Sequence, residues 1–397
     1  MISVSRLLCG MVTEGDSLRY FRNTTPEQTS ETPVLHRPIV VSNSTRRCNL
    51  HCVHCYAGSK DQTYEGELTY EEGRKFIQGL ADFKVPVLLF SGGEPMLRDR
   101  VFDLASYARS LGLRVVLSTN GTLITPEVAR KIKEIGFAEA GISLDGIGER
   151  NDRFRGQTGA FDAALRAVRN CLSIGQKVSV RFTITRRNYM DIPQIFDLAE
   201  REEVPRLCFY HLAYVGRGDH LQGDDLDPEE TRKVVDYIFD RTVDMHRRGF
   251  KKEVLTVDNH ADGAYLYLRV KRDDPQRAQA ALDLLRQNGG NNSGIRIGAV
   301  DNLGNVHADQ FWWHYSFGNV KERSFGDIWQ DTSDPVMRGL KDRRGMLKGR
   351  CARCQFVDIC GGNLRVRAES VHGDIWAEDP ACYLTDDEIG LVSRTLS

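Results

Sequence analysis

Residues 42–58 read SNSTRRCNLHCVHCYAG and place Cys48, Cys52 and Cys55 in a C-x3-C-x2-C run. The run directly follows PIVV at residues 38–41, an apolar stretch typical of a strand. An iron-sulfur cluster ordinarily takes four cysteine ligands, so three supplied together leave one iron open to an outside molecule. Zinc is the alternative, but zinc modules usually present paired C-x2-C units with four ligands. The loop therefore predicts an iron-sulfur cluster that takes part in chemistry.

Around this loop, strand-like runs alternate with amphipathic helical segments. The strand-like runs lie at residues 38–44, 85–93, 113–121, 138–146, 177–185 and 206–214. The segments with helical spacing lie at residues 69–83, 101–111, 125–136, 160–175, 191–203 and 228–246. Regular alternation of this kind predicts an α/β fold with a parallel sheet, either open or closed into a barrel. Both architectures place ligands at the carboxyl ends of the strands, where we expect the site.

The pattern changes after about residue 250. A charged helical stretch at 275–287 is followed by the breaker cluster NGGNNSG at 288–294 and a hairpin candidate at 294–309. Four more cysteines follow, Cys351, Cys354, Cys360 and Cys382. Four sulfur ligands complete either a zinc site or a [4Fe-4S] cluster, and spacing alone does not choose. We divide the chain into an N-terminal segment 1–37, a core 38–250, a helical linker 251–290 and a C-terminal domain 291–397.

Composition excludes some partners. The 54 basic and 55 acidic residues leave a net charge of -1, which gives no reason to expect nucleic acid or an anionic membrane surface. No stretch approaches the roughly 20 apolar residues of a membrane span. Seven of the ten cysteines lie in two clusters, which indicates metal binding in a reducing compartment, so we expect a cytoplasmic protein. Cys9, Cys171 and Cys208 stand alone, and we interpret them as core or incidental thiols.

Small and polar residues end three of the strand-like runs. They are Ser91-Gly92-Gly93-Glu94-Pro95, Ser118-Thr119-Asn120-Gly121 and Ser143-Leu144-Asp145-Gly146. Glycines let the backbone approach a ligand closely, and a carboxylate accepts hydrogen bonds from an ammonium group. Each tetrapeptide also suits an ordinary turn, so none is specific alone.

Together these motifs resemble the radical S-adenosylmethionine (SAM) superfamily, except that His54 stands where an aromatic residue is usual. The resemblance implies a partial (βα)6 barrel, and a SAM-bound [4Fe-4S] cluster on the three cysteines that generates a 5'-deoxyadenosyl radical for hydrogen abstraction. It assigns Gly92, Gly93, Glu94 and Pro95 to the methionine part of SAM. By the same resemblance Ser118, Asn120, Ser143 and Asp145 are further SAM contacts, and Arg181 neighbours its carboxylate.

The C-terminal cysteines resemble the SPASM/twitch-type extension of these enzymes, which implies an auxiliary [4Fe-4S] cluster on Cys351, Cys354, Cys360 and Cys382. The full SPASM pattern would place two further cysteines at positions where Leu364 and Asp309 stand. The expected inventory is therefore two [4Fe-4S] clusters, one binding SAM and one auxiliary, and we expect the second to carry an electron rather than to bind the substrate directly.

Residues 7–20 and 304–329 resemble enzymes of the siroheme-dependent haem pathway. This implies oxidative removal of two acetate side chains from didecarboxysiroheme to give iron-coproporphyrin III, with an unidentified electron donor and acceptor. The related steps of haem d1 synthesis and of haem synthesis from iron-coproporphyrin share the same cysteine plan and stay open as alternatives. A SPASM-type peptide maturase is a further alternative. A non-catalytic electron carrier would leave the strand-end motifs without a purpose.

An iron tetrapyrrole with several carboxylates calls for arginines and an axial histidine. The arginine candidates are Arg46, Arg47, Arg217 and Arg296, and the histidine candidates are His211, His307 and His314. Each has an alternative interpretation as an ordinary packing or surface residue.

Overall fold

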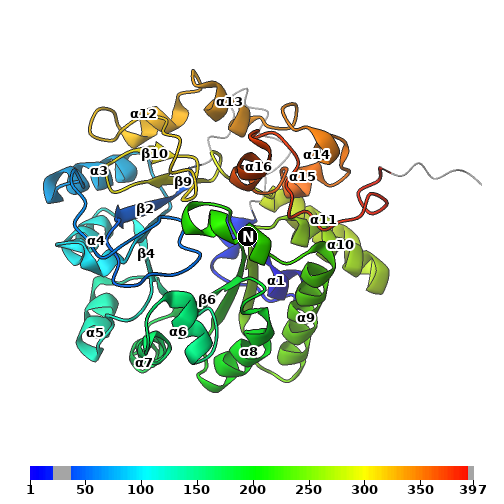
Figure 1. Cartoon of the computed structure of the whole chain (residues 1–397), viewed down its shortest axis with the longest axis horizontal. Coiled ribbons are helices and arrows are strands. Elements are labelled where there is room, and N and C mark those ends of the chain that lie inside the picture. The colour runs from blue at the N-terminus through cyan, green and yellow to red at the C-terminus, as the bar shows by residue number, and fades with distance from the viewer. Residues whose placement is uncertain (21–36, 392–397) are drawn as a thin grey trace, which may run out of the picture.

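The computed structural model describes residues 1–20 and 37–391. Its centre is one ten-stranded sheet with the order β1-β8-β7-β6-β5-β4-β3-β2-β9-β10 (Figure 1). The six expected strands are all present, as β2 (Ile39–Thr45), β3 (Val87–Gly92), β4 (Arg114–Thr119), β5 (Glu139–Ser143), β6 (Val178–Ile184) and β7 (Arg206–His211). Each pairs in parallel with its neighbour, so their carboxyl ends share one rim.

The helices expected between these strands are also confirmed. They are α3 (Tyr70–Asp82), α4 (Val101–Ser110), α5 (Pro126–Ile135), α7 (Ala160–Leu172), α8 (Ile192–Arg201) and α9 (Pro228–Arg247). Thr69 and Asp227 begin α3 and α9 with capping boxes, in which the cap side chain and a glutamate three residues on satisfy each other's backbone donors. A short helix that was not expected, α6 (Glu149–Arg155), follows β5.

Four further strands extend the sheet beyond the six. β8 (Glu253–Val257) pairs in parallel with β7, and β1 (Ile2–Ser3) pairs antiparallel with β8. At the other edge β9 (Ile297–Val300) pairs in parallel with β2 and forms the expected hairpin with β10 (Val306–His307). Residues 251–290, expected as a purely helical linker, thus begin with a sheet strand. Its EVLTV sequence is short and lies between charged residues, which conceals its strand character.

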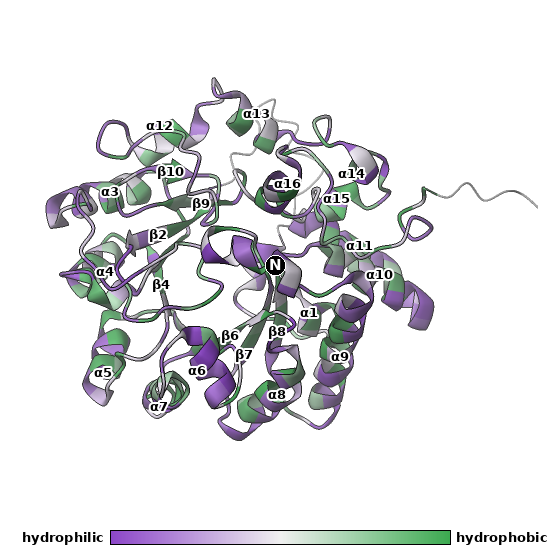
Figure 2. Ribbon diagram, viewed as in Figure 1, coloured by the Kyte–Doolittle hydropathy of each residue, from purple (hydrophilic) through white to green (hydrophobic). Residues whose placement is uncertain are grey.

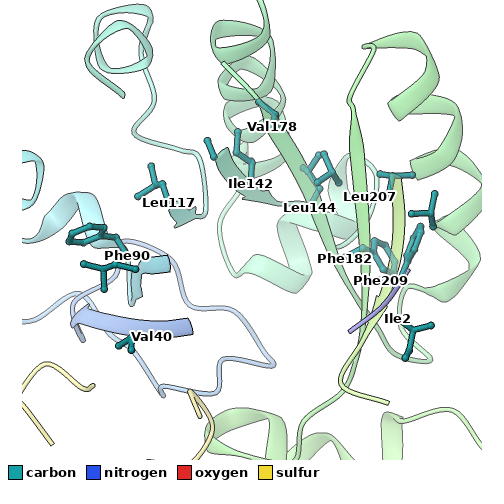
Figure 3. Close-up of a cluster of buried hydrophobic side chains, with 14 of the residues drawn as sticks. Ile2, Val40, Phe90, Leu117, Ile142, Leu144, Val178, Phe182, Leu207 and Phe209 are labelled. Carbon is teal, nitrogen blue, oxygen red and sulfur yellow. The ribbon is translucent and has the colours of Figure 1, made fainter. Parts of the chain in front are cut away.

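The helices cover the outer face of the curved sheet, as Figure 1 shows for α4, α5, α7, α8 and α9. Their apolar faces turn toward the strands and their polar faces turn outward (Figure 2). The core between the two layers includes Val40, Phe90, Ile142, Phe182 and Phe209 (Figure 3), all at most 2% exposed. This packing fixes the strands, and through them the loops at their carboxyl ends.

The remaining elements are helices and 3-10 turns. Near the N-terminus lie α1 (Val4–Cys9) and α2 (Asp16–Arg19), and α10 (Ala261–Asp273) and α11 (Pro275–Asn288) follow β8. The C-terminal part comprises α12 (Phe325–Gln330), α13 (Pro335–Lys341), α14 (Gly349–Arg353), α15 (Val357–Cys360) and α16 (Arg365–His372). Short 3-10 turns lie at η1 (Pro95–Leu97), η2 (Tyr189–Asp191) and η3 (Gly216–Asp224).

One fully buried arginine of the C-terminal part, Arg367, ties this part to the barrel. Arg367 donates to both carboxylate oxygens of Asp379, at 2.7 and 2.9 Å, and neither side chain is exposed. The same guanidinium donates to the carbonyls of Leu212, just after β7, and Asp258, just after β8. The C-terminal part is thereby held against the rim at which the strands end.

Candidate functional site

A cavity opens at the carboxyl ends of the strands and contains the predicted cysteines. Its lining includes Cys48, Cys52 and Cys55 from the loop after β2, together with the ends of β3 to β7. Cys48 and Cys52 are 7% and 8% exposed, and Cys55 is partly exposed. Of the cysteines in the described chain, these are the three that line this cavity. A donor set of three thiols fits a cluster that keeps one iron for another ligand.

The cysteine loop is fastened on two sides. The backbone amides of His51 and Val53 donate to the carbonyls of Arg155 and Phe154, at the end of α6. On the other side Arg217 donates to the carbonyls of Cys52 and Ser59, at 2.7 and 2.8 Å. Both attachments involve backbone carbonyls or amides, so the thiols are positioned independently of the identity of most loop side chains.

Two polar side chains bond directly to the thiols. Arg155 Nη1 donates to Cys52 Sγ at 3.5 Å, and Asn120 Nδ2 lies 3.8 Å from Cys48 Sγ. Burial raises the pKa of Cys52, while the charge of Arg155 acts in the opposite direction. Burial raises the pKa of Cys48 to about 12. Because burial disfavours the charged thiolate, these thiols need a cationic partner to lose their protons. A bound iron would supply that positive charge.

Glycines at the end of β3 allow the cysteine loop and this strand to touch. A Cβ on Gly92 would lie 2.3 Å from the Thr45 carbonyl oxygen, and one on Gly93 would lie 2.1 Å from that of Arg47. The Gly93 amide donates to the Thr45 carbonyl at 2.7 Å. Both glycines line the cavity. The sequence therefore needs glycine here for backbone packing as well as for any ligand.

Glu94 lies beneath the cavity wall and is fully buried. Its carboxylate accepts from the Thr119 hydroxyl and the Asn120 amide, both at 2.9 Å, and from the Met96 amide at 3.2 Å. Burial raises the pKa of Glu94 to about 7 although these hydrogen bonds favour the charged form. Glu94 and Pro95 do not line the cavity, so the structure places them behind Gly92 and Gly93.

Of the other predicted SAM contacts, four line the cavity and one does not. Ser118, Asn120, Ser143 and Arg181 line the cavity, and Arg181 donates to Ser118 Oγ at 2.6 Å. Asp145 does not line it. Its carboxylate pairs with Arg155 and accepts from the Thr183 amide at 2.6 Å. These contacts place Asp145 behind the wall, where it positions Arg155.

His54 packs as an aromatic ring would. Its ring centroid lies 4.7 Å from that of Phe154, and burial lowers its pKa to about 4. A neutral imidazole at this position can therefore pack on Phe154 as an aromatic side chain does.

The four C-terminal cysteines also meet in one cavity. Cys351, Cys354, Cys360 and Cys382 line it, with the apolar side chains of Phe356, Val357, Leu384 and Ile389. Four thiols in an apolar enclosure fit a cluster ligated entirely by protein. No three His, Cys, Asp or Glu side chains in the described ranges converge as ligands of a single metal ion.

The positions where the full SPASM pattern would have cysteines are filled by ordinary side chains. Leu364 belongs to an apolar cluster with Phe311, Trp312 and Trp376. Asp309 is buried, where it accepts from the Ser293 hydroxyl and from the Phe311 amide. Both positions are therefore used for packing and backbone support.

The candidate arginines for substrate carboxylates lie away from the cavity lining. Arg47 pairs with Asp61 at the surface, and Arg217 supports the cysteine loop. Arg46 donates to the Ala57 carbonyl, with its guanidinium near the rings of Tyr64 and Trp313. Arg296 precedes β9, at the amino end of the parallel strands. The arginines that do line the cavity are Arg155 and Arg181.

Of the three candidate histidines, His211 alone lines the cavity. His307 directs Nδ1 to the Tyr315 carbonyl at 2.7 Å and has Nε2 3.2 Å from Asp301. His314 is exposed and pairs with Glu369 at 2.9 Å. Burial opposes protonation of His211, but the charge and hydrogen bond of Asp262 raise its pKa.

Several residues that line the cavity were not predicted from the sequence as site residues. Tyr56, Thr119, Tyr210 and Phe311 line the wall, and Tyr56 and Phe311 meet edge to face with centroids 5.5 Å apart. Tyr56 and Thr119 lie inside quoted motifs and could have been found from their adjacency to assigned residues. Phe311 reaches the cavity from the C-terminal part, which only the tertiary structure reveals.

Comparison with known proteins agrees with this geometry. Residues 42–199 match the model of the radical SAM superfamily. The chain belongs to this superfamily and is a radical SAM enzyme, a class that uses SAM and a [4Fe-4S] cluster.

Its relatives narrow the class. The chain is 55% identical over 395 residues to the Fe-coproporphyrin III synthase of Methanosarcina barkeri, covering 98% of this chain and 99% of that protein. It is 43% identical to the pre-heme d1 synthase of Dinoroseobacter shibae, over 93% and 91% of the two chains. SuiB of Streptococcus suis, bound to its precursor peptide SuiA, has a TM-score of 0.70 over 88% and 77%, at 16% identity. The last likeness confirms the expected radical SAM fold.

A search for membrane spans over residues 1–20 and 37–391 found no helix with the length and apolar character to cross a bilayer.

Proposed function

We propose that the enzyme removes two acetate side chains from didecarboxysiroheme by an oxidative radical reaction and forms iron-coproporphyrin III. The observation that carries the proposal is the 55% identity to Fe-coproporphyrin III synthase, which extends over 98% of the chain and so includes the residues of both thiol cavities. The match covers 99% of that relative, so nearly every region of the relative has a counterpart in this chain.

In this proposal Cys48, Cys52 and Cys55 hold the SAM-binding [4Fe-4S] cluster. Gly92, Gly93, Ser118, Asn120 and Ser143 line the space beside them and would bind SAM. When bound, the cluster and SAM supply a carbon radical that takes hydrogen from the substrate. Arg181 contributes a buried cation, with a buried Nε that has no hydrogen-bond partner, as a site for a carboxylate.

Glu94, Asp145 and Arg155 act on these residues rather than on the ligand. Glu94 holds Thr119 and the Asn120 amide in place, and Asp145 orients Arg155 toward Cys52. The wall of Tyr56, Leu212, Ala213 and Phe311 limits access of water to the reacting atoms. The chain thus supplies position, charge and exclusion of water.

Cys351, Cys354, Cys360 and Cys382 hold the auxiliary [4Fe-4S] cluster in this proposal. Removal of an acetate group after hydrogen abstraction leaves an electron on the macrocycle, and a second cluster is a site that can accept it. Loss of one C-terminal ligand should therefore remove about half of the iron, because each [4Fe-4S] cluster holds four of the eight iron atoms. Cys360→Ala tests this, and Cys171→Ala in the core is the matched control that should retain all the iron.

The activity is tested on anaerobically reconstituted enzyme with SAM, a strong reductant and didecarboxysiroheme, with products followed by mass spectrometry. We expect deoxyadenosine together with a product that has lost two acetate groups. Cys52→Ala should form neither. Conversion of iron-coproporphyrin III to haem, or formation of a haem d1 precursor, with no loss of acetate from didecarboxysiroheme would overturn the proposal in favour of a related enzyme. Deoxyadenosine without any tetrapyrrole product would also reject it.

A further inference from the structure

One histidine of the cavity wall is held by a chain of buried hydrogen bonds. His211 is the last residue of β7, and its Nε2 lies 3.0 Å from Oδ2 of Asp262, in the first turn of α10. Oδ1 of the same carboxylate accepts from the hydroxyl of Tyr383 at 2.8 Å. Asp262 is 0% exposed, His211 is 6% exposed and Tyr383 is 3% exposed.

The carboxylate determines which face of the imidazole is available. A carboxylate only accepts hydrogen bonds, so the proton of the neutral ring lies on Nε2, facing Asp262. The lone pair is then on Nδ1. No residue in the described ranges forms a hydrogen bond to this nitrogen, although the ring is part of the cavity lining. An imidazole held in this way has the arrangement of a metal ligand, whose other nitrogen donates to a carboxylate.

The substrate proposed above carries iron, and the structure leaves few ligands for it. Both nitrogens of His307 face protein oxygens, and His314 lies at the surface. His54 also lines the cavity. It belongs to the cysteine loop and packs on Phe154 of α6, and its Nδ1 is buried. His211 is the last residue of β7, and the cysteine loop follows β2. In the sheet, strands β3 to β6 lie between β7 and β2. A macrocycle bound between β7 and the cysteine loop would present its iron to His211 on β7 and its edge to the cysteine loop.

We propose that Nδ1 of His211 is the axial ligand of the substrate's iron, with Asp262 and Tyr383 as positioning residues. The inference rests on the proposed function, because it requires an iron tetrapyrrole in this cavity. Ligation fixes the height and tilt of the macrocycle, which selects the side chain that faces the radical. The carboxylate of Asp262 strengthens donation from Nδ1 by polarising the ring, and Tyr383 holds this carboxylate in place.

The test uses reconstituted enzyme and ferric coproporphyrin III, without SAM or reductant. Oxidised [4Fe-4S] clusters give no electron paramagnetic resonance signal, so the ferric tetrapyrrole is observed alone. We expect a nitrogen-ligated spectrum for the wild type and for His314→Ala, the matched control on an exposed histidine. His211→Ala should lose this signature and bind the tetrapyrrole about tenfold or more weakly, and added imidazole should restore the signature.

A second variant separates positioning from folding. Asp262→Asn should keep the histidine signature but raise the reduction potential of the iron, because an amide polarises the ring less than a carboxylate. Iron content and SAM cleavage without tetrapyrrole report whether each variant is folded, and His211→Gln replaces any alanine variant that is not.

The outcomes distinguish the two proposals. An unchanged spectrum in His211→Ala, or a wild type that removes acetate without any histidine signature, overturns the axial ligand and leaves the proposed function standing. A wild type that neither binds the tetrapyrrole nor converts didecarboxysiroheme overturns the proposed function, and the axial ligand with it.

Discussion

The guanidinium of Arg155 donates a hydrogen bond to the sulfur of Cys52, 103 residues earlier in the chain. The same side chain pairs with the buried carboxylate of Asp145, which fixes its orientation. A positive donor at a cluster sulfur stabilises the reduced, more negative cluster and so raises its reduction potential.

Arg155→Met should therefore lower the potential of the SAM-binding cluster. A hydrogen bond to a charged group contributes about 1.5 to 3 kcal/mol, which corresponds to a shift on the order of 60 to 130 mV for one electron. A redox titration followed by electron paramagnetic resonance measures this shift. Because the substitution leaves Asp145 buried without its partner, the double variant Arg155→Met/Asp145→Asn is the control. An unchanged potential in both variants would contradict the role given to Arg155.

Glu94 should make the stability of the SAM-free enzyme depend on pH. Burial raises its pKa from 4.5 to about 7 in the fold. A carboxyl group with a raised pKa contributes stability that is present below pH 4.5 and is lost as the pH rises through about 7. The melting temperature of the wild type, measured relative to Glu94→Gln, should thus fall between pH 5 and pH 8. A constant difference across this range would exclude a raised pKa for Glu94.

Gly93→Ala should displace the cysteine loop. The added Cβ would lie 2.1 Å from the backbone oxygen of Arg47, and backbone cannot move aside as a flexible side chain does. We expect a loss of about 1 to 3 kcal/mol in stability, together with reduced iron incorporation. Gly79→Ala is the matched control, since it lies within α3 with no atom within 4 Å of the added Cβ. It should stabilise the protein by about 0.5 to 1 kcal/mol. Equal effects of the two substitutions would count against the close contact.

Arg367→Met should destabilise the attachment of the C-terminal part to the barrel. The substitution leaves the carboxylate of Asp379 buried and unpaired, which costs about 3 to 5 kcal/mol. Arg367→Met/Asp379→Asn should recover part of this loss, because the neutral amide carries no unpaired charge. Chemical unfolding measures both variants. If the single and double variants are equally stable, the unpaired charge of Asp379 is not the source of the loss.

The strands and helices of the core could be predicted because each follows from a local pattern. The runs that became β2 to β7 are apolar and bounded by glycine or polar residues, and the helices between them repeat apolar residues at helical spacing. β8 was missed because five residues between charged neighbours carry too little local signal. Its place in the sheet depends on pairing with β7 and β1, which is a tertiary effect.

The residues of the site, like the strands and helices, could be predicted only where the signal is local in the sequence. The thiols of Cys48, Cys52 and Cys55, the two glycines and Ser118, which line the cavity, could be predicted because they lie in short local motifs. Arg155 was not found, since an arginine near the end of a short helix is indistinguishable in sequence from a surface charge. Its contact with Cys52 exists because Phe154 and Arg155 dock on the cysteine loop. Glu94 and Asp145 were predicted as SAM contacts, and the structure buries both side chains outside the lining of the cavity.

The apolar cluster that includes Leu364 and Trp312 packs against Tyr56, next to Cys55, and against Cys351 of the second cavity. An electron that passes between the two groups of thiols by this route crosses hydrocarbon and indole rings instead of water. The two groups of thiols are thus connected through packed apolar side chains of the protein interior.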